Sequence, residues 1–362
     1  MTERVVDDRQ WMRRALALAR RGWGQVSPNP LVGAVVVRDH VAVGEGWHAR
    51  FGDAHAEPVA LAQAGEAARG ATLYVTLEPC AHHGKQPPCV DAILASGIAR
   101  VVVAARDPNP VASGGVERLR AHGVQVDVGV CARAARAMNA PFFFALQHTD
   151  RPYITLKLAC TIDGAIADHA RTRGWFTGDA SRRAVHALRA SADAIAVGRD
   201  TVLIDDPALT VREGYAPRVA PARVVVARHG RVPATSQLVR TAREVPVWVL
   251  GAPPADERAS LEARGVTVLP AASLAEGLTA LRARGVHHLM VEGGATLAGA
   301  LLDEGMVDRL VIFRAPLVLG AGALPAFAGL HGRTLATAVR LRPRVRRRLG
   351  DDLLEIYSVT RR

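Results

Sequence analysis

Three metal-ligand side chains and one carboxylate stand in an order that predicts a catalytic zinc site. His55 is followed two residues later by Glu57, and Cys80 and Cys89 each come directly after a proline. A catalytic zinc ion takes three protein ligands and keeps one position for water, which loses a proton more easily on the metal. His55, Cys80 and Cys89 supply these ligands. Glu57 stands too close to His55 to ligate the same metal easily, so we assign it the transfer of protons.

The surroundings of these residues support the assignment. His55 and Cys89 each stand where a helix is expected to begin, and a helix N-terminus favours the thiolate form of cysteine. Zinc deaminases of nucleobases use the same division of labour, with a non-ligating glutamate as general acid and base. The alternative is two inert core cysteines and a stray histidine, which the ordered combination disfavours. His82 and His83 are spare candidates for ligation, and we interpret them as loop residues near a substrate.

The second half of the chain holds a weaker chemical signal. Gly293 and Gly294 follow an expected strand and open an expected helix, where backbone N–H groups can meet a phosphate. An ordinary turn explains two adjacent glycines at least as well. Asp205 and Asp206, which precede a proline, are likewise compatible with a capped turn.

Alternating strands and helices are expected to position both groups of residues. In the first half, continuous apolar runs predict strands at residues 31–37, 72–77 and 100–105. Helical patterns are expected at residues 11–20, 56–64, 88–96, 116–122 and 132–146. The first half is therefore predicted to be a three-layer α/β domain.

A second alternating unit is predicted to begin near residue 151. Its expected strands cover residues 153–158, 194–197, 223–226, 245–250, 266–269 and 288–292, and its expected helices cover 181–191, 256–264, 274–284 and 296–304. Residues 339–346 alternate, residues 350–352 turn and residues 353–359 return, which predicts a terminal antiparallel hairpin. The arginines at 346–348 are interpreted as the solvated part of one strand.

Length and composition fit a protein of two globular domains. The chain has 362 residues, of which 49% are hydrophobic and 22% charged, and it contains no apolar run long enough for a membrane span. Its net charge of +12 would suit nucleic acid, but the basic residues form no single tract with interleaved aromatics. A phosphorylated small substrate suits a positive surface equally well. The N-terminus has no signal-peptide pattern, so we expect a cytoplasmic location.

The motifs, taken together, resemble the bifunctional deaminase–reductase family of riboflavin biosynthesis. In the first half the resemblance is carried by residues 27–35, 44–48, 52–57, 76–89 and 107–110, and in the second half by residues 156–164, 175–178, 193–195, 198–212 and 291–297. The eight residues between Cys80 and Cys89 favour this family, because many other zinc deaminases have only two residues there.

The resemblance implies the fold, the domains and the chemistry. Residues 1–148 would form a cytidine-deaminase-like zinc domain, and residues 149–362 a dihydrofolate-reductase-like α/β domain that uses NADPH. The implied substrate is 2,5-diamino-6-ribosylamino-4(3H)-pyrimidinone 5′-phosphate. The first domain would release its 2-amino group as ammonia, and the second would reduce the ribosyl group to ribityl.

The resemblance also implies the residues of both sites. Besides Glu57 and the zinc ligands, those facing the dinucleotide would be Ala159, Trp175, Thr201, Asp205, Gly294, Ala295, Thr296, Leu297, Ala298, Gly299 and Ala300. Those facing the pyrimidine substrate would be Asn29, His48, His82, Arg173, Arg189, Leu209, Arg212 and Glu292. Arg171 and Arg173 stand where the family usually has glycine and serine, so an arginine would replace the serine as a phosphate partner.

Arg228, after the strand at residues 223–226, occupies a position where many dinucleotide sites carry an acidic residue. By analogy with Rossmann folds, the absence of a carboxylate there favours NADPH over NADH.

Three alternatives stay open at this point. The chain could be a monofunctional pyrimidine deaminase whose reductase-like domain is non-catalytic or repurposed. It could be an RNA-editing deaminase, or a nucleotide-binding sensor without turnover. We favour the bifunctional enzyme, a homo-oligomer with neither nucleic acid nor membrane as partner.

Overall fold

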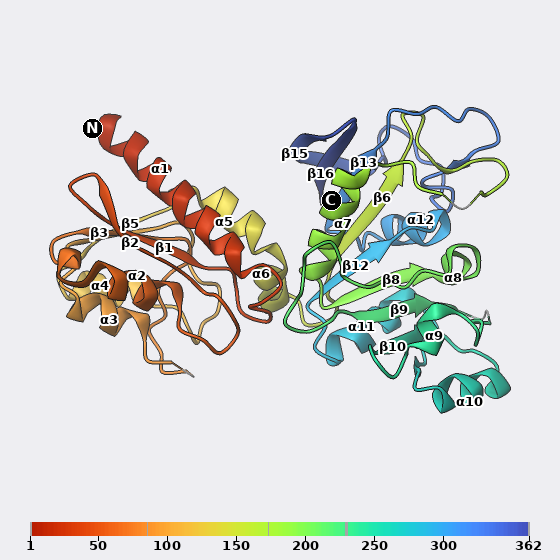
Figure 1. Cartoon of the computed structure of the whole chain (residues 1–362), viewed down its shortest axis with the longest axis horizontal. Helices are drawn as coiled ribbons and strands as arrows, with labels where there is room; N and C mark the ends of the chain where they lie inside the picture. The colour runs from red at the N-terminus through yellow and green to blue at the C-terminus, as the bar shows by residue number, and fades with distance from the viewer. Residues whose placement is uncertain (1, 85, 173, 229–230, 361–362) are drawn as a thin grey trace. The chain divides into compact units, whose positions relative to one another are not determined.

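A large sheet organises each of two units of the chain (Figure 1). The computed structural model describes residues 2–84, 86–172, 174–228 and 231–360. The units span Met1–Gln147 and His148–Arg362. In both, helices flank a sheet, which confirms the predicted α/β class.

The sheet of the first unit has five strands in the order β2-β1-β3-β4-β5. These strands are β1 (Gly33–Arg38), β2 (Val41–Trp47), β3 (Thr72–Val75), β4 (Arg100–Val103) and β5 (Gln125–Val128). Strand β1 is antiparallel to β2 and β3, whereas β3, β4 and β5 run parallel. The carboxyl ends of β3 and β4 therefore lie at the same edge, from which the loops carrying Cys80 and Asp107 leave.

Helices cover both faces of this sheet, as the prediction of three layers requires (Figure 1). The α-helices are α1 (Thr2–Ala19), α2 (Ala56–Ala64), α3 (Cys89–Ala95), α4 (Gly115–Ala121), α5 (Ala132–Met138) and α6 (Ala140–Gln147), and short 3-10 turns cover Arg20–Gly22 and Gly65–Ala68. Val35 and Val37 pack toward α1 and α5, whereas Ala34 and Val36 pack toward α2, α3 and α4. Successive residues of β1 thus serve two cores.

Helix α2 lies against β2 at two glycines. A side-chain carbon on Gly44 would stand 2.1 Å from the carbonyl oxygen of Ala60, and one on Gly46 would stand 2.2 Å from that of Ala56. No side chain fits at such distances, so both glycines are required for this approach. The contact fixes the start of α2, which carries His55 and Glu57.

One helix predicted for the first unit is in fact two helices. The expected helix at residues 132–146 is divided into α5 and α6 at Asn139. The Asn139 side chain accepts a hydrogen bond from the backbone N–H of Leu31 and donates one to the Leu31 carbonyl. It therefore holds the segment that leads into β1.

A nine-stranded sheet forms the second unit, in the order β11-β10-β9-β8-β12-β6-β13-β16-β15. Its strands are β6 (Tyr153–Cys160), β8 (Ala194–Gly198), β9 (Ala222–Val226), β10 (Val247–Leu250), β11 (Thr267–Leu269), β12 (His288–Glu292), β13 (Arg309–Arg314), β15 (Arg340–Leu349) and β16 (Asp352–Thr360). The first seven strands in that order are parallel. A separate pair joins β7 (Ala165–Ala167) to β14 (Leu324–Pro325).

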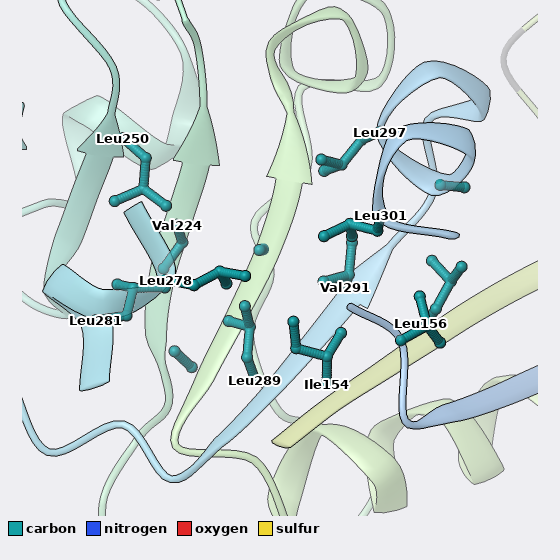
Figure 2. Packing of buried hydrophobic residues seen from close by; sticks show 14 of the residues in the cluster. Ile154, Leu156, Val224, Leu250, Leu278, Leu281, Leu289, Val291, Leu297 and Leu301 are labelled. Atoms are coloured by element: carbon teal, nitrogen blue, oxygen red, sulfur yellow. The ribbon is translucent and has the colours of Figure 1, made fainter. Parts of the chain in front are cut away.

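Six helices of the second unit flank its sheet. They are α7 (Asp179–Ala190), α8 (Arg199–Asp205), α9 (Gln237–Arg240), α10 (Ala255–Ala263), α11 (Leu274–Ala283) and α12 (Ala295–Asp303). Figure 2 shows leucines of α11 and α12, such as Leu281 and Leu301, meeting Ile154, Leu289 and Val291 from the sheet. The opposite face packs against α7, α8, α9 and α10. No described helix is long and apolar enough to cross a membrane.

The predicted C-terminal hairpin is present as β15 and β16, which are antiparallel. Strand β15 lies at the edge of the sheet, and its arginines at 346–348 are exposed as predicted. The turn of the hairpin leads into the buried Asp352, whose carboxylate accepts hydrogen bonds from the Gly178 N–H and the Ser181 hydroxyl. Gly178 is the N-cap of α7, so Asp352 anchors the start of that helix to the hairpin.

Candidate active sites

The three predicted zinc ligands converge in the first unit. His55 is the N-cap of α2, Cys89 is the first residue of α3, and Cys80 lies in the loop after β3. The His55 Nδ1 atom is 3.2 Å from Cys89 Sγ and 3.6 Å from Cys80 Sγ, and all three ligand atoms lie within 4.8 Å of one another. Tetrahedral zinc with ordinary bond lengths separates a nitrogen and a sulfur ligand by about 3.6 Å. The donor set and its spacing fit zinc.

The two thiols have strongly shifted pKa values. A hydrogen bond from Cys89 lowers the pKa of the Cys80 thiol to about 4, and His55 adds to the effect. The same contact with Cys80, together with burial, raises the pKa of Cys89. Zinc binds cysteine as the thiolate, so we expect proton release when a metal binds.

Glu57 lies beside this group on a buried wall. It is the second residue of α2, it is 3% exposed, and it lines a cavity of about 300 Å³ that His55 and Cys80 also line. Burial raises the pKa of Glu57 to about 7. Its carboxyl group is thus placed where it can reach a small molecule in the cavity.

The residues predicted to face the pyrimidine line the same cavity. Asn29 and His48 are joined by a 3.2 Å hydrogen bond between Nδ2 and Nε2, and His48 Nδ1 lies 3.2 Å from the Ala54 carbonyl oxygen. His48 Nδ1–H therefore donates to Ala54, and Nε2 accepts from the Asn29 amide. This chain fixes the rotamer of Asn29. His82 lines the cavity as well, and its Nδ1 atom is buried without a hydrogen-bond partner among the described residues.

Sequence reasoning missed other residues of this cavity. Gln86, Asp107, Asn109 and Phe142 line it as well. The loop after β4 is held by the buried Glu78, which accepts hydrogen bonds from the backbone N–H groups of residues 107, 114 and 116. A glutamate directly before the Pro-Cys pair was the signal available for this anchor.

A second cavity, of about 390 Å³, lies in the second unit at the carboxyl ends of parallel strands. Its walls include the ends of β6, β8 and β12, the helix α8 and the loop after it. The residues that were predicted for this site and line the cavity are Ala159, Trp175, Thr201, Asp205, Gly294, Arg189, Leu209, Arg212 and Glu292. Ligands of open α/β sheets bind at such strand ends. Arg173 lies outside the described residues.

The glycines after β12 form a cradle at the start of α12. Gly293 and Gly294 have φ angles of 70° and 81°, and a side-chain carbon on Gly294 would come within 3.4 Å of Thr201 Oγ1. Gly294 is the N-cap of α12 and offers no capping side chain. The N–H groups of the first helical turn therefore face the cavity end of the helix, which fits a phosphate of a dinucleotide.

The remaining residues of the predicted run, Ala295 to Ala300, form the first turns of α12. The side chains of Leu297 and Ala298 belong to the hydrophobic core, and Gly299 packs against the backbone of Gly329. Any contact of this run with a dinucleotide would therefore go mainly through the backbone at the start of the helix.

Buried charges connect the walls of the second cavity. The Arg189 guanidinium donates two hydrogen bonds to Glu292, at 2.5 and 2.9 Å, and a third to the carbonyl oxygen of Thr210 at 2.8 Å. Lys157 Nζ lies 4.0 Å from Glu292. Burial alone would raise the pKa of Glu292, but Arg189, helped by Lys157, holds it below its ordinary value. Burial lowers the pKa of Lys157.

Comparisons with known proteins agree with both sites. The profile described as the cytidine and deoxycytidylate deaminase zinc-binding region matches residues 5–105, and that of the RibD C-terminal domain matches residues 152–354. The riboflavin biosynthesis protein RibD of Aquifex aeolicus is 44% identical, over 97% of this chain and 98% of its own. That of Escherichia coli is 40% identical, over 96% and 98%.

Solved structures give the same result. Acinetobacter baumannii RibD, form 1, has a TM-score of 0.85 and 37% identity, over 99% of this chain and 100% of its own. The deaminase/reductase of Thermotoga maritima has a TM-score of 0.84 and 34% identity, over the same shares.

The fold and the two sites thus define a two-domain enzyme that joins a zinc-dependent deaminase to an NADPH-dependent reductase. The chain belongs to the RibD family of riboflavin biosynthesis. The predicted deaminase, reductase and cofactors are confirmed, and nothing in these comparisons favours a monofunctional deaminase.

Proposed function

We propose that the chain releases the 2-amino group of 2,5-diamino-6-ribosylamino-4(3H)-pyrimidinone 5′-phosphate as ammonia, and then reduces the ribosyl group of the product to ribityl. The observation that carries this proposal is the pairing, in one chain, of a cavity that holds the zinc triad and Glu57 with a second cavity that holds a phosphate cradle. In this proposal the first domain, residues 1–148, carries out the deamination and the second, residues 149–362, the reduction.

In the first cavity, His55, Cys80 and Cys89 would hold zinc, which would supply Lewis acidity for the activation of water. Glu57 takes up a proton from that water and delivers a proton to the departing amino group, so that ammonia leaves. Asn29, held by His48, directs its amide oxygen away from His48, where it can accept a hydrogen bond from the pyrimidine. His82 lines the same cavity and faces the same ligand.

In the second cavity, NADPH supplies a hydride. The N–H groups at Gly294 bind a phosphate of the dinucleotide, while Trp175 and Thr201 line the wall beside it. Arg212 faces the phosphate of the substrate. Arg189 and Glu292 neutralise each other and hold the wall in place. The cavity is large enough for part of each ligand, and its positive residues complement their phosphates.

The partners in this proposal are phosphorylated pyrimidines and a second copy of the chain, without nucleic acid or membrane. Strand β15 is a sheet edge, but its arginines, Pro343 and the bulge beside it oppose pairing with another strand, so a second copy would bind elsewhere. Light scattering would reveal a homo-oligomer. The four cysteines are free, which suits the cytoplasm that we propose as its location.

One assay tests the activity. Purified protein is given the diaminopyrimidine substrate, and ammonia release and NADPH oxidation are followed separately. We expect ammonia without NADPH, and NADPH oxidation only after ammonia has been released. NADPH oxidation that is absent even with deaminated intermediate would contradict the reductase half, while the lack of ammonia would contradict the deaminase half.

A further inference from the structure

The segment that carries Arg212 has an unusual backbone. Between α8 and β9, the non-glycine residues Asp206, Leu209 and Glu213 have φ angles of 40°, 49° and 59°. Residues other than glycine rarely adopt this left-handed backbone conformation. A loop that contains several of them needs contacts with the rest of the domain to keep its shape. The side chain of Arg212 is exposed, so packing does not hold it.

Leu209 anchors this loop in the hydrophobic core, and helix α7 holds the part of the loop that follows it. His186 Nδ1 accepts a hydrogen bond from the backbone N–H of Arg212 at 3.0 Å, and Arg189 donates to the carbonyl oxygen of Thr210 at 2.8 Å. The two side chains lie three residues apart, on one face of the helix. They bind backbone groups two residues apart, as the edge of a neighbouring strand would.

Only a neutral imidazole can make the first of these bonds. His186 is 8% exposed. Burial lowers its pKa, and the charges of Arg189 and Arg212 lower it further, against the opposite effect of Glu213 and Glu292. The ring is therefore neutral near pH 7, with its proton on Nε2 and Nδ1 free to accept.

We propose that His186 is a positioning residue of the reductase. By accepting the N–H of Arg212, it fixes the backbone from which the Arg212 guanidinium reaches the phosphate of the substrate. The inference rests on the proposed function, because Arg212 is taken there as the phosphate contact. His186 itself touches neither the substrate nor the cofactor.

Two substitutions test the hydrogen-bond acceptor of His186 separately from the volume of its ring. His186→Leu fills similar space without an acceptor, whereas His186→Asn places an amide oxygen at the position of Nδ1. With the deaminated phosphorylated intermediate, we expect the KM of His186→Leu to rise about tenfold, and that of His186→Asn to stay within about threefold. Their kcat, their KM for NADPH and their ammonia release should stay within about twofold of wild type. Arg183→Ala, an exposed change on the same helix, serves as the matched control.

The same assay distinguishes this inference from the proposed function. In an Arg212→Ala background, His186→Leu should raise the KM no further, since both changes remove one interaction. An Arg212→Ala enzyme with an unchanged KM would overturn the assignment of Arg212, and with it the proposed phosphate contact.

A raised KM in Arg212→Ala beside an unchanged KM in His186→Leu would overturn the role of His186 alone. So would a His186→Leu enzyme that loses kcat and NADPH binding together, or a His186→Asn enzyme as impaired as His186→Leu. Thermal unfolding verifies that each variant folds. If His186→Leu does not, His186→Ala, which adds no bulk, carries the test.

Discussion

Replacing Glu292 with glutamine removes the carboxylate that balances two cations in the wall of the reductase cavity. Arg189 and Glu292 have side chains that are 8% and 9% exposed, and Lys157 is 11% exposed at 4.0 Å. Glutamine has nearly the same shape and can still accept one hydrogen bond from Arg189. The change therefore isolates the charge, and it leaves a buried guanidinium without a counter-ion.

The loss can be estimated from the burial of the pair. Removing one partner of a buried ion pair costs about 3–5 kcal/mol, because the other charge stays buried and uncompensated. The Arg258–Glu262 pair is a matched control, since its side chains are 49% and 46% exposed and such a pair contributes about 0.3–0.5 kcal/mol. Glu262→Gln should therefore be almost neutral. A domain with a stability of about 5–15 kcal/mol should survive the loss in Glu292→Gln.

Hydrogen exchange can measure this loss of stability in the reductase unit alone. The backbone amides of β6 and β12 exchange when the reductase sheet opens, and their opening free energy should fall by about 3–5 kcal/mol in Glu292→Gln. Amides of β3 and β4, in the other unit, should not change. NADPH oxidation should fall at least tenfold while ammonia release persists. An opening free energy within about 1 kcal/mol of wild type would refute the argument from buried charge.

Four further outcomes are expected. Elemental analysis should find about one zinc per chain and a loss of it in Cys80→Ala; full occupancy in that variant would contradict the ligand set. Glu57→Gln should keep its zinc and lose deamination by about two orders of magnitude or more, while it still reduces deaminated substrate. Steady-state reduction should favour NADPH over NADH, and Arg228→Ala should weaken that preference; an unchanged ratio would exclude Arg228 as its cause. Burial lowers the pKa of His288 to about 4 from 6.5, so between these values the unfolded state binds a proton that the folded state does not. The free energy of unfolding, measured by denaturant titration, should therefore fall by about 3 kcal/mol between pH 7 and pH 4. His288→Asn should reduce this loss.

Continuous apolar runs predicted most of the buried strands, but some strands were missed. Strand β2 was not assigned because Gly44 and Gly46 interrupt its pattern. The structure explains those glycines by the approach of α2, which depends on a partner distant in the sequence. Strand β13 was also missed, although its apolar run at residues 310–313 was a signal for it. Helix α8 was absent from the predicted helices because it is short and partly exposed.

The site residues divide in the same manner. The zinc ligands and Glu57 could be predicted because the metal requires fixed residue types in a local order. His186 could not, since it acts by accepting a hydrogen bond from a backbone N–H elsewhere in the chain. A backbone N–H belongs to almost every residue and leaves no trace in the sequence. Contacts of this kind become visible only in the folded chain.

The contact between α7 and Asp352 has a consequence for folding during synthesis. Strand β6 is synthesised early, yet its neighbours β12 and β13 end only at Glu292 and Arg314, and α7 gains its contact with Asp352 later still. All strand partners of the zinc-binding unit lie within Met1–Gln147. That unit can fold while synthesis continues, whereas the sheet of the reductase unit is complete only after β16 has been added.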